Sequence, residues 1–469
     1  MPGIYMEKSG LCQLIRSFSP IELREARKFL RSPFYNQRQD LIDLFEWLVV
    51  QPAPSREKTW CQLFGQTPFN EQKLRLLMSY LHRLLEQYLT VTAWNDDHLS
   101  IQIYLAKAYR KRQLTGAFDK LQRQMEKALE AQPLRNAYYH DSRYKLQWEA
   151  HQLTYTQNPT DVSRLRQLSD AADVIYLAQK LRLICLLSAH ESVYQSERHS
   201  GLDEAVVALA EREEMAVIPA IAVYLHGYRM LRKPDEEVHF QRFKQLLLEQ
   251  SALFFEEEMS GLFILAINYC VRRINAGEGR FFREALDLYK EGLSKRYLLE
   301  NGVLSRFTYH NIVAAGLHTG ELDWVRFFIL EYKNRLEKQY RESSFSFNLA
   351  RLEYAQRHYD FVLELLQRAN YRDPLLNLAA KTLVLKTYYD LGEYETLESH
   401  LDAMRNYIHR KRVLGYHRTN YLNIIRYAEK LMRLNPNDKK SVYTLRQEIE
   451  NEAVLTEKAF FQKNLLVTE

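Results

Sequence analysis

The chain has 469 residues, of which 46% are hydrophobic and 26% charged, and its formal net charge is +6. This composition provides a large buried core and excludes a disordered chain. The basic excess is smaller than that of a typical nucleic-acid-binding protein, although local patches can still bind. The four cysteines lie far apart without a C-x-x-C pair, so we expect reduced thiols and no metal site.

Proline is absent between Pro234 and Pro374, in a span rich in Leu, Ala, Glu, Lys, Arg and Gln. These residues favour helix, and alternating β-branched runs are hard to find, so we predict an all-α protein. The N-terminal residues lack the apolar core of a signal peptide. The longest apolar runs, 215–225 and 262–271, are too short to cross a bilayer. We therefore expect a cytoplasmic protein with no membrane partner.

The first 95 residues predict a small helical domain. Ser19-Pro-Ile-Glu22 reads as a capping box with proline at the first helical position. The apolar spacing predicts helices over about 20–31, 38–50, 58–64 and 71–89, all amphipathic. We expect these helices to pack together.

From residue 96 to 435 the pattern becomes a series of helices of about 12 to 20 residues, separated by single Gly or Pro positions. Ala285, Val325, Val362 and Leu397 recur at spacings of 40, 37 and 35 residues. Such a period predicts a solenoid of helical hairpins, a fold that generally binds partners. Residues 436–469 read as polar-faced helices that cap the end of the array.

Tyr388-Tyr-x-Leu-Gly-x-Tyr394 carries the clearest repeat, with Gly392 in the turn between two helical patterns. It resembles the turn of the tetratricopeptide repeat, and the resemblance extends over roughly 280–411. Three positions depart from the family pattern. Leu397 and Val325 stand where alanine is usual, and Arg357 replaces the turn glycine.

The resemblance implies that the first helix of each hairpin lines a concave face used for peptides. The candidate peptide-binding residues on that face are His310, Phe347, Arg351, Tyr354, Thr382, Lys386 and Tyr389. Their aromatic and cationic character suits a peptide with acidic groups or a free carboxylate. The alternative is that these helices are ordinary packed hairpins without a ligand groove.

A basic segment lies near the C-terminus, with no acidic residue from 405 to 418. The candidate basic patch consists of Arg405, His409, Arg410, Lys411, Arg412 and Arg418. Such a cluster can bind RNA or phosphate, but it also suits a solvated helix end whose cations complement the helix dipole. Acidic stretches elsewhere make self-association through opposite charges a further possibility.

Residues 57–90 also permit a second interpretation, since a short helix, a Gly/Pro turn and a longer basic helix describe a DNA-binding helix-turn-helix. Lys73, Arg75, His82 and Arg83 would face DNA. A winged form requires a β-hairpin after the long helix, and residues 91–97 provide one short segment at best. We favour structural packing for this region.

Catalytic motifs are missing from the sequence: there is no phosphate-binding Gly-rich loop, H-E-x-x-H or G-x-S-x-G. We therefore expect no enzyme activity and no cofactor. The hypothesis that follows is a scaffold or adaptor that binds a protein or peptide on a helical-repeat face. The alternative is a nucleic-acid-binding regulator with an N-terminal helix-turn-helix and partner-sensing repeats.

Overall fold

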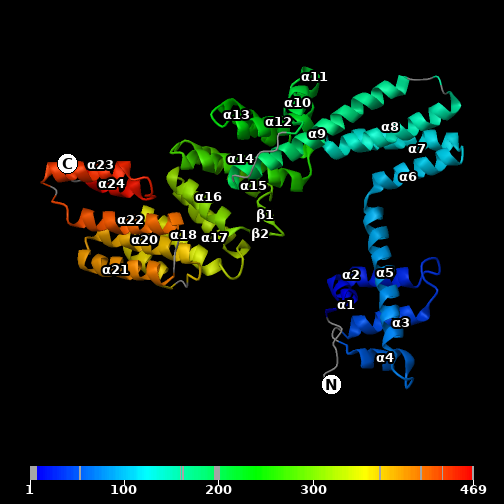
Figure 1. Ribbon diagram of the computed structural model, residues 1–469, viewed down its shortest axis with the longest axis horizontal. Helices are drawn as coiled ribbons and strands as arrows, with labels where there is room; N and C mark the ends of the chain where they lie inside the picture. The colour runs from blue at the N-terminus through cyan, green and yellow to red at the C-terminus, as the bar shows by residue number, and fades with distance from the viewer. Residues whose placement is uncertain are drawn as a thin grey trace. The chain divides into compact units, whose positions relative to one another are not determined.

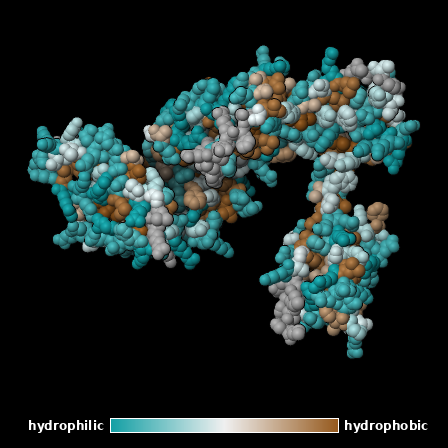
Figure 2. Space-filling model, viewed as in Figure 1, coloured by the Kyte–Doolittle hydropathy of each residue, from teal (hydrophilic) through white to brown (hydrophobic). Residues whose placement is uncertain are grey.

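The computed structural model describes residues 8–51, 54–158, 160, 163–194, 201–368, 371–411, 415–435 and 437–466. The chain divides into two compact units, Met1–Tyr176 and Leu177–Glu469. Among the described residues the regular structure is helical apart from one pair of two-residue strands, which confirms the all-α class. In the view of Figure 2, hydrophilic side chains cover most of the visible face of both units.

Unit 1 begins with five helices that share one hydrophobic core. They are α1 (Gly10–Ser17), α2 (Pro20–Leu30), α3 (Gln39–Val50), α4 (Arg56–Phe64) and α5 (Glu71–Asp96). The capping box starts α2 as predicted, because Ser19 Oγ accepts from the Glu22 amide and the Glu22 carboxylate accepts from the Ser19 amide. In Figure 1, α5 runs alongside the other four helices, which bury its leucine face.

Three further helices of unit 1 form a second core. They are α6 (His98–Lys111), α7 (Thr115–Ala131) and α8 (Ala137–Gln157). The α6–α7 hairpin packs on α8, and Phe118 and Met125 are almost fully buried between them. Helix α9 (Ser163–Tyr194) crosses the boundary between the two units.

Unit 2 continues with the rest of α9 and a succession of helices in which chain neighbours pack together. Its first part comprises α10 (Asp203–Ala210), α11 (Glu213–Ala216), α12 (Pro219–Arg232), α13 (Glu237–Glu249), the 3-10 turn η2 (Ser251–Leu253), α14 (Glu256–Asn275) and α15 (Phe281–Ser294). Its second part comprises α16 (Arg306–His318), α17 (Leu322–Tyr332), η3 (Lys333–Arg335), α18 (Arg341–Ala355), α19 (Tyr359–Arg368), α20 (Pro374–Leu391), α21 (Tyr394–Arg410), α22 (Gly415–Met432), α23 (Lys439–Asn451) and α24 (Lys458–Leu466).

Five of the helical hairpins have the same type of turn. A residue with positive φ ends the first helix, and the next backbone N–H donates to the carbonyl five positions back, as in a Schellman motif. The positive-φ residues of these turns are Gln113, Gly277, Gly320, Arg357 and Gly392. The apolar positions of the predicted repeat are correspondingly buried: Ala285, Val325, Val362 and Leu397 are at most 1% exposed.

A β-hairpin interrupts the helices between α15 and α16. Strands β1 (Leu299–Glu300) and β2 (Val303–Leu304) pair antiparallel, with Leu299 opposite Leu304. Asn301 and Gly302 have φ values of 51° and 79°, as a two-residue turn of type I′ requires. Leu304 also forms a parallel bridge with Leu336, after η3. This small sheet was not predicted from the sequence.

The C-terminal helices belong to the core that they cover. Buried residues of α23 and α24 form one hydrophobic cluster with those of α20, α21 and α22. Helix α24 packs on both α23 and α22 (Figure 1). No helix among the described residues is long and apolar enough to cross a membrane.

Candidate functional site on the first helices of the hairpins

The first helices α16, α18, α20 and α22 pack in sequence, each against the next. The peptide-binding residues expected from the sequence lie on three of them, and we call their surface the first-helix face. It consists of His310 on α16, Arg351 and Tyr354 on α18, and Lys386 and Tyr389 on α20, whereas the expected Phe347 on α18 is buried. Thr382 was expected there too. In the structure its side chain is buried, and its hydroxyl donates to the Leu378 carbonyl of its own helix.

His310 and Arg351 meet around the buried Asn348. Asn348 Nδ2 lies 2.7 Å from His310 Nδ1, and Arg351 Nη1 donates to Asn348 Oδ1 and to the His310 carbonyl at 3.3 and 3.2 Å. Burial lowers the pKa of His310 to about 4 and that of Arg351 to about 10, so at neutral pH the imidazole is uncharged and the guanidinium is cationic. Phe347 is buried and lies edge-on to the His310 ring.

Tyr354 and Lys386 join α18 to α20. The Tyr354 hydroxyl donates to Asp390 at 2.6 Å, and burial together with this carboxylate raises the pKa of Tyr354. The Lys386 ammonium lies 5.2 Å from the centre of the Tyr354 ring, a cation–π distance. The first-helix face is therefore held by polar contacts between adjacent first helices.

Residues near the C-terminus, Glu457 and Phe460, lie on this face. Lys386 Nζ donates to Glu457 at 3.0 Å, and Tyr389 contacts the edge of Phe460 at 5.7 Å between ring centres. On α22, Asn420 Oδ1 accepts from the Thr456 amide at 2.8 Å. We call residues 452–466 the C-terminal segment. It supplies a carboxylate and an aromatic ring to the residues expected to take an acidic peptide.

A cleft remains open farther upstream, between α14, the β-hairpin and the start of α16. Its volume is about 930 Å³. Four carboxylates line it, Glu256, Glu257, Glu300 and Glu337, and none of them forms an ion pair with a Lys or Arg among the described residues. Its apolar lining includes Ile264, Leu298, Leu299 and Val303. We call it the hairpin cleft.

The hairpin cleft continues the first-helix face by register. Arg351 precedes its turn residue Arg357 by six positions, and Ile264 precedes Gly277 by thirteen. The difference of seven residues is close to two helical turns, so both side chains lie on the same side of their helices. This cleft was not predicted from the sequence, although Asn301-Gly302 is a strong hairpin signal for the segment that forms its wall.

The basic segment 405–418 is partly neutralised. Arg405 forms ion pairs with Asp402 and Glu429 at 2.6 and 2.5 Å. His409, Arg410 and Lys411 are exposed at the end of α21, and Arg418 is half-buried on α22. Arg412 lies outside the described residues. The exposed cations therefore stand at a helix C-terminus, where they complement the dipole.

The proposed DNA-facing residues are distributed along α5. Lys73 lies 4.2 Å from the centre of the Phe64 ring, Arg75 pairs with Glu71 at 2.8 Å, and His82 lies 4.0 Å from Glu86. Arg83 is exposed. Helix α5 continues to Asp96 and α6 begins at His98, so the described residues hold no β-hairpin where a wing would follow.

Comparisons of this chain with protein-family models, curated proteins and solved structures gave no match.

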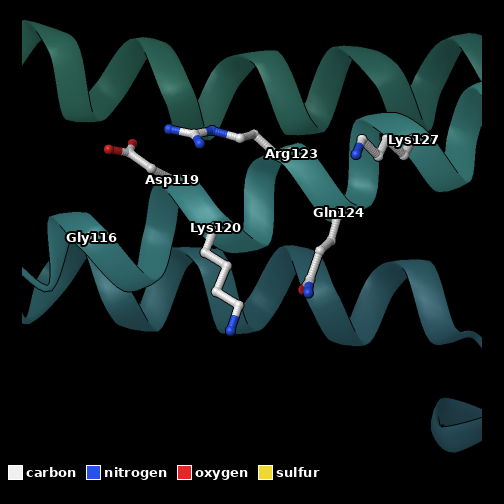
Figure 3. Close-up of a pocket in the computed structure, with 6 residues that line it drawn as sticks. All are labelled: Gly116, Asp119, Lys120, Arg123, Gln124 and Lys127. Carbon is white, nitrogen blue, oxygen red and sulfur yellow. The ribbon is translucent and has the colours of Figure 1, made fainter.

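A shallow depression on α7 illustrates a surface without a convergent site. It is lined by Gly116, Asp119, Lys120, Arg123, Gln124 and Lys127, all exposed and all from one helix. Figure 3 shows Asp119 and Arg123 pointing to one side of α7, and Lys120 and Gln124 to the other. Among the described residues, no group of three or more His, Cys, Asp or Glu side chains could hold a metal ion.

Proposed function

We propose that the hairpins of unit 2 form a tetratricopeptide-like solenoid that binds a segment of a partner protein on its first-helix face, as a non-catalytic scaffold or adaptor. The observation that supports this most directly is the C-terminal segment, which lies on that face through Glu457 and Phe460. A surface that holds one peptide segment by a charge and a ring has the chemistry to hold another.

The hairpin cleft lies upstream of the first-helix face, and none of its lining residues belongs to the C-terminal segment or packs under it. Its four carboxylates, which outnumber the one lining cation Arg296, and its apolar residues suit a partner segment that carries Lys or Arg next to an apolar anchor. The sequence suggested an acidic partner instead. That chemistry fits Arg351 and Lys386, of which Lys386 is already paired with Glu457.

Charge reversal in the cleft tests this function. Glu256→Lys/Glu257→Lys changes two exposed carboxylates in the first turn of α14, and Glu213→Lys/Glu214→Lys makes the same change in the first turn of α11, away from the cleft. Both full-length variants and the wild type are used as bait in quantitative affinity capture.

We expect a set of proteins bound by the wild type and the α11 variant to be lost from the α14 variant. Their binding should weaken at high salt, because exposed charges are screened beyond about 10 Å at 0.1 M. Equal capture by all three baits, or equal loss from both variants, would contradict binding in the cleft.

A further inference from the structure

A second cavity lies between α19, α20 and α21, on a different stripe of α20 from Lys386 and Tyr389. Its volume is about 330 Å³, at the lower end of the range for small-molecule sites. Leu363, Leu366, Ala380 and Val384 supply apolar walls. We call it the Lys381 cavity.

Two polar atoms of this cavity are buried without a hydrogen-bond partner among the described residues. They are the Tyr371 hydroxyl and Asn377 Oδ1. A buried polar group without a partner costs about 1–3 kcal/mol, so proteins rarely keep one unless water or a ligand completes it. The lining residues Tyr371 and Asn377 therefore bring one hydroxyl that can donate and one amide oxygen that can accept to the wall of the same cavity.

Lys381 adds a cation to the same wall. It forms no ion pair with an Asp or Glu among the described residues, and its ammonium lies 5.8 Å from the centre of the Tyr407 ring. Burial, followed by the nearby Arg410, lowers the pKa of Lys381, because both disfavour its positive charge. An anion in the cavity would attract the Lys381 ammonium and so offset both its burial and the repulsion from Arg410.

The far wall is fixed by His400. His400 Nε2 lies 2.9 Å from the Lys381 carbonyl and donates to it, and the Tyr388 ring meets the His400 ring at 5.9 Å between centres. The backbone of Lys381 is thus held against α21 while its side chain has no acidic partner.

We propose that the Lys381 cavity binds a small organic acid with a short branched apolar chain and a hydroxyl group. The carboxylate would accept hydrogen bonds from the Lys381 ammonium and the Tyr371 hydroxyl. The ligand hydroxyl would donate to Asn377 Oδ1. The apolar chain would lie against Leu363, Leu366 and Val384, and this lining disfavours inorganic anions.

Binding of 2-hydroxyisocaproate to the full-length chain tests the proposal, with its uncharged amide as the matched analogue. Isothermal titration and methyl NMR should show saturable binding of the acid in the millimolar range or tighter, near −4 kcal/mol for a Kd of about 1 mM. The amide should bind at least about tenfold more weakly, because it lacks the charge that Lys381 recognises.

Three variants complete the test. Lys381→Met should weaken binding of the acid by about tenfold or more and Tyr371→Phe by several-fold. Lys127→Met, the same change at an exposed lysine of unit 1, should leave it unchanged. If Lys381→Met does not fold, the acid–amide comparison and Tyr371→Phe still decide the outcome.

No saturable binding of the acid up to about 20 mM would overturn the proposal and leave a cavity filled by water. Equal binding of acid and amide, or unchanged binding in a folded Lys381→Met chain, would overturn it as well. Partner capture through the hairpin cleft does not involve Lys381, so the two proposals can fail separately.

Discussion

At the scale of single residues, two of the departures from the repeat pattern, Arg357 and Val325, have local explanations. Arg357 stands where a turn glycine is expected and adopts that glycine's conformation, with φ at 63°. Val325 stands where alanine is expected, and it packs on a glycine of the preceding helix. A β-carbon at Gly316 would lie 2.2 Å from Val325 Cγ2. The small residue that this helix crossing needs is therefore Gly316 on α16, and position 325 on α17 can hold valine.

Replacing Arg357 by glycine should stabilise unit 2. A residue with a β-carbon at positive φ costs about 1–2 kcal/mol, part of which is offset by the larger entropy of glycine in the unfolded chain. We expect Arg357→Gly to raise the free energy of unfolding by about 0.5–1 kcal/mol in urea denaturation. The mirror change Gly392→Arg, at φ 75°, should lower it by a similar amount. A loss of stability in Arg357→Gly would contradict strain at this turn.

At the scale of elements, the C-terminal segment is tied to α22 by side-chain bonds to its backbone. The Thr456 amide donates to Asn420 Oδ1, and the Val454 carbonyl accepts from Asn423 Nδ2 at 2.9 Å. Both asparagines are buried, so their amides have few other partners. These bonds were not predictable from residues 436–469 alone, because the partners are about 30 positions away.

Asn420→Ala should loosen the C-terminal segment where it meets α22. The Thr456 amide loses its acceptor, at a cost of about 1 kcal/mol, so its hydrogen exchange should accelerate roughly fivefold. Asn464→Ala is the control, since Asn464 Nδ2 donates to the Phe460 carbonyl within α24. Unchanged exchange of Thr456 in the Asn420 variant would show that the segment is held by other contacts.

At the scale of the whole molecule, three histidines make both units sensitive to acid. Burial, followed by neighbouring arginines, lowers the pKa of His140 in unit 1 and His226 in unit 2 to about 4. Burial lowers the pKa of His310 to the same value. In the unfolded chain the pKa of these imidazoles is near 6.5. Between about pH 6.5 and 4 the unfolded chain therefore binds more protons than the folded chain, and the free energy of unfolding decreases as the pH is lowered.

The variant His310→Gln should reduce this acid sensitivity while keeping an acceptor for Asn348. At pH 5, about 1.5 pH units below the pKa of a histidine in the unfolded chain, the neutral His310 should lower the free energy of unfolding by about 2 kcal/mol. We expect the fall in melting temperature of unit 2 from pH 7 to pH 5 to be smaller in His310→Gln than in the wild type. His409→Gln, at an exposed position, should behave as the wild type. An unchanged fall in the His310 variant would contradict a neutral imidazole at this site.

The helical class, the capping box of α2 and the burial of the repeat positions could be predicted from the residues alone. These features depend on local propensity and on a periodicity that neighbouring residues share. Which of the expected ligand residues reach the surface depends on packing between helices and could not be predicted in this way. Thr382 has the helical spacing of a residue on the same face as Lys386, but its side chain is buried. Lys386 pairs with Glu457, a carboxylate 71 positions away in the chain. The hairpin cleft and the Lys381 cavity likewise arise from contacts between helices, which no single stretch of sequence encodes.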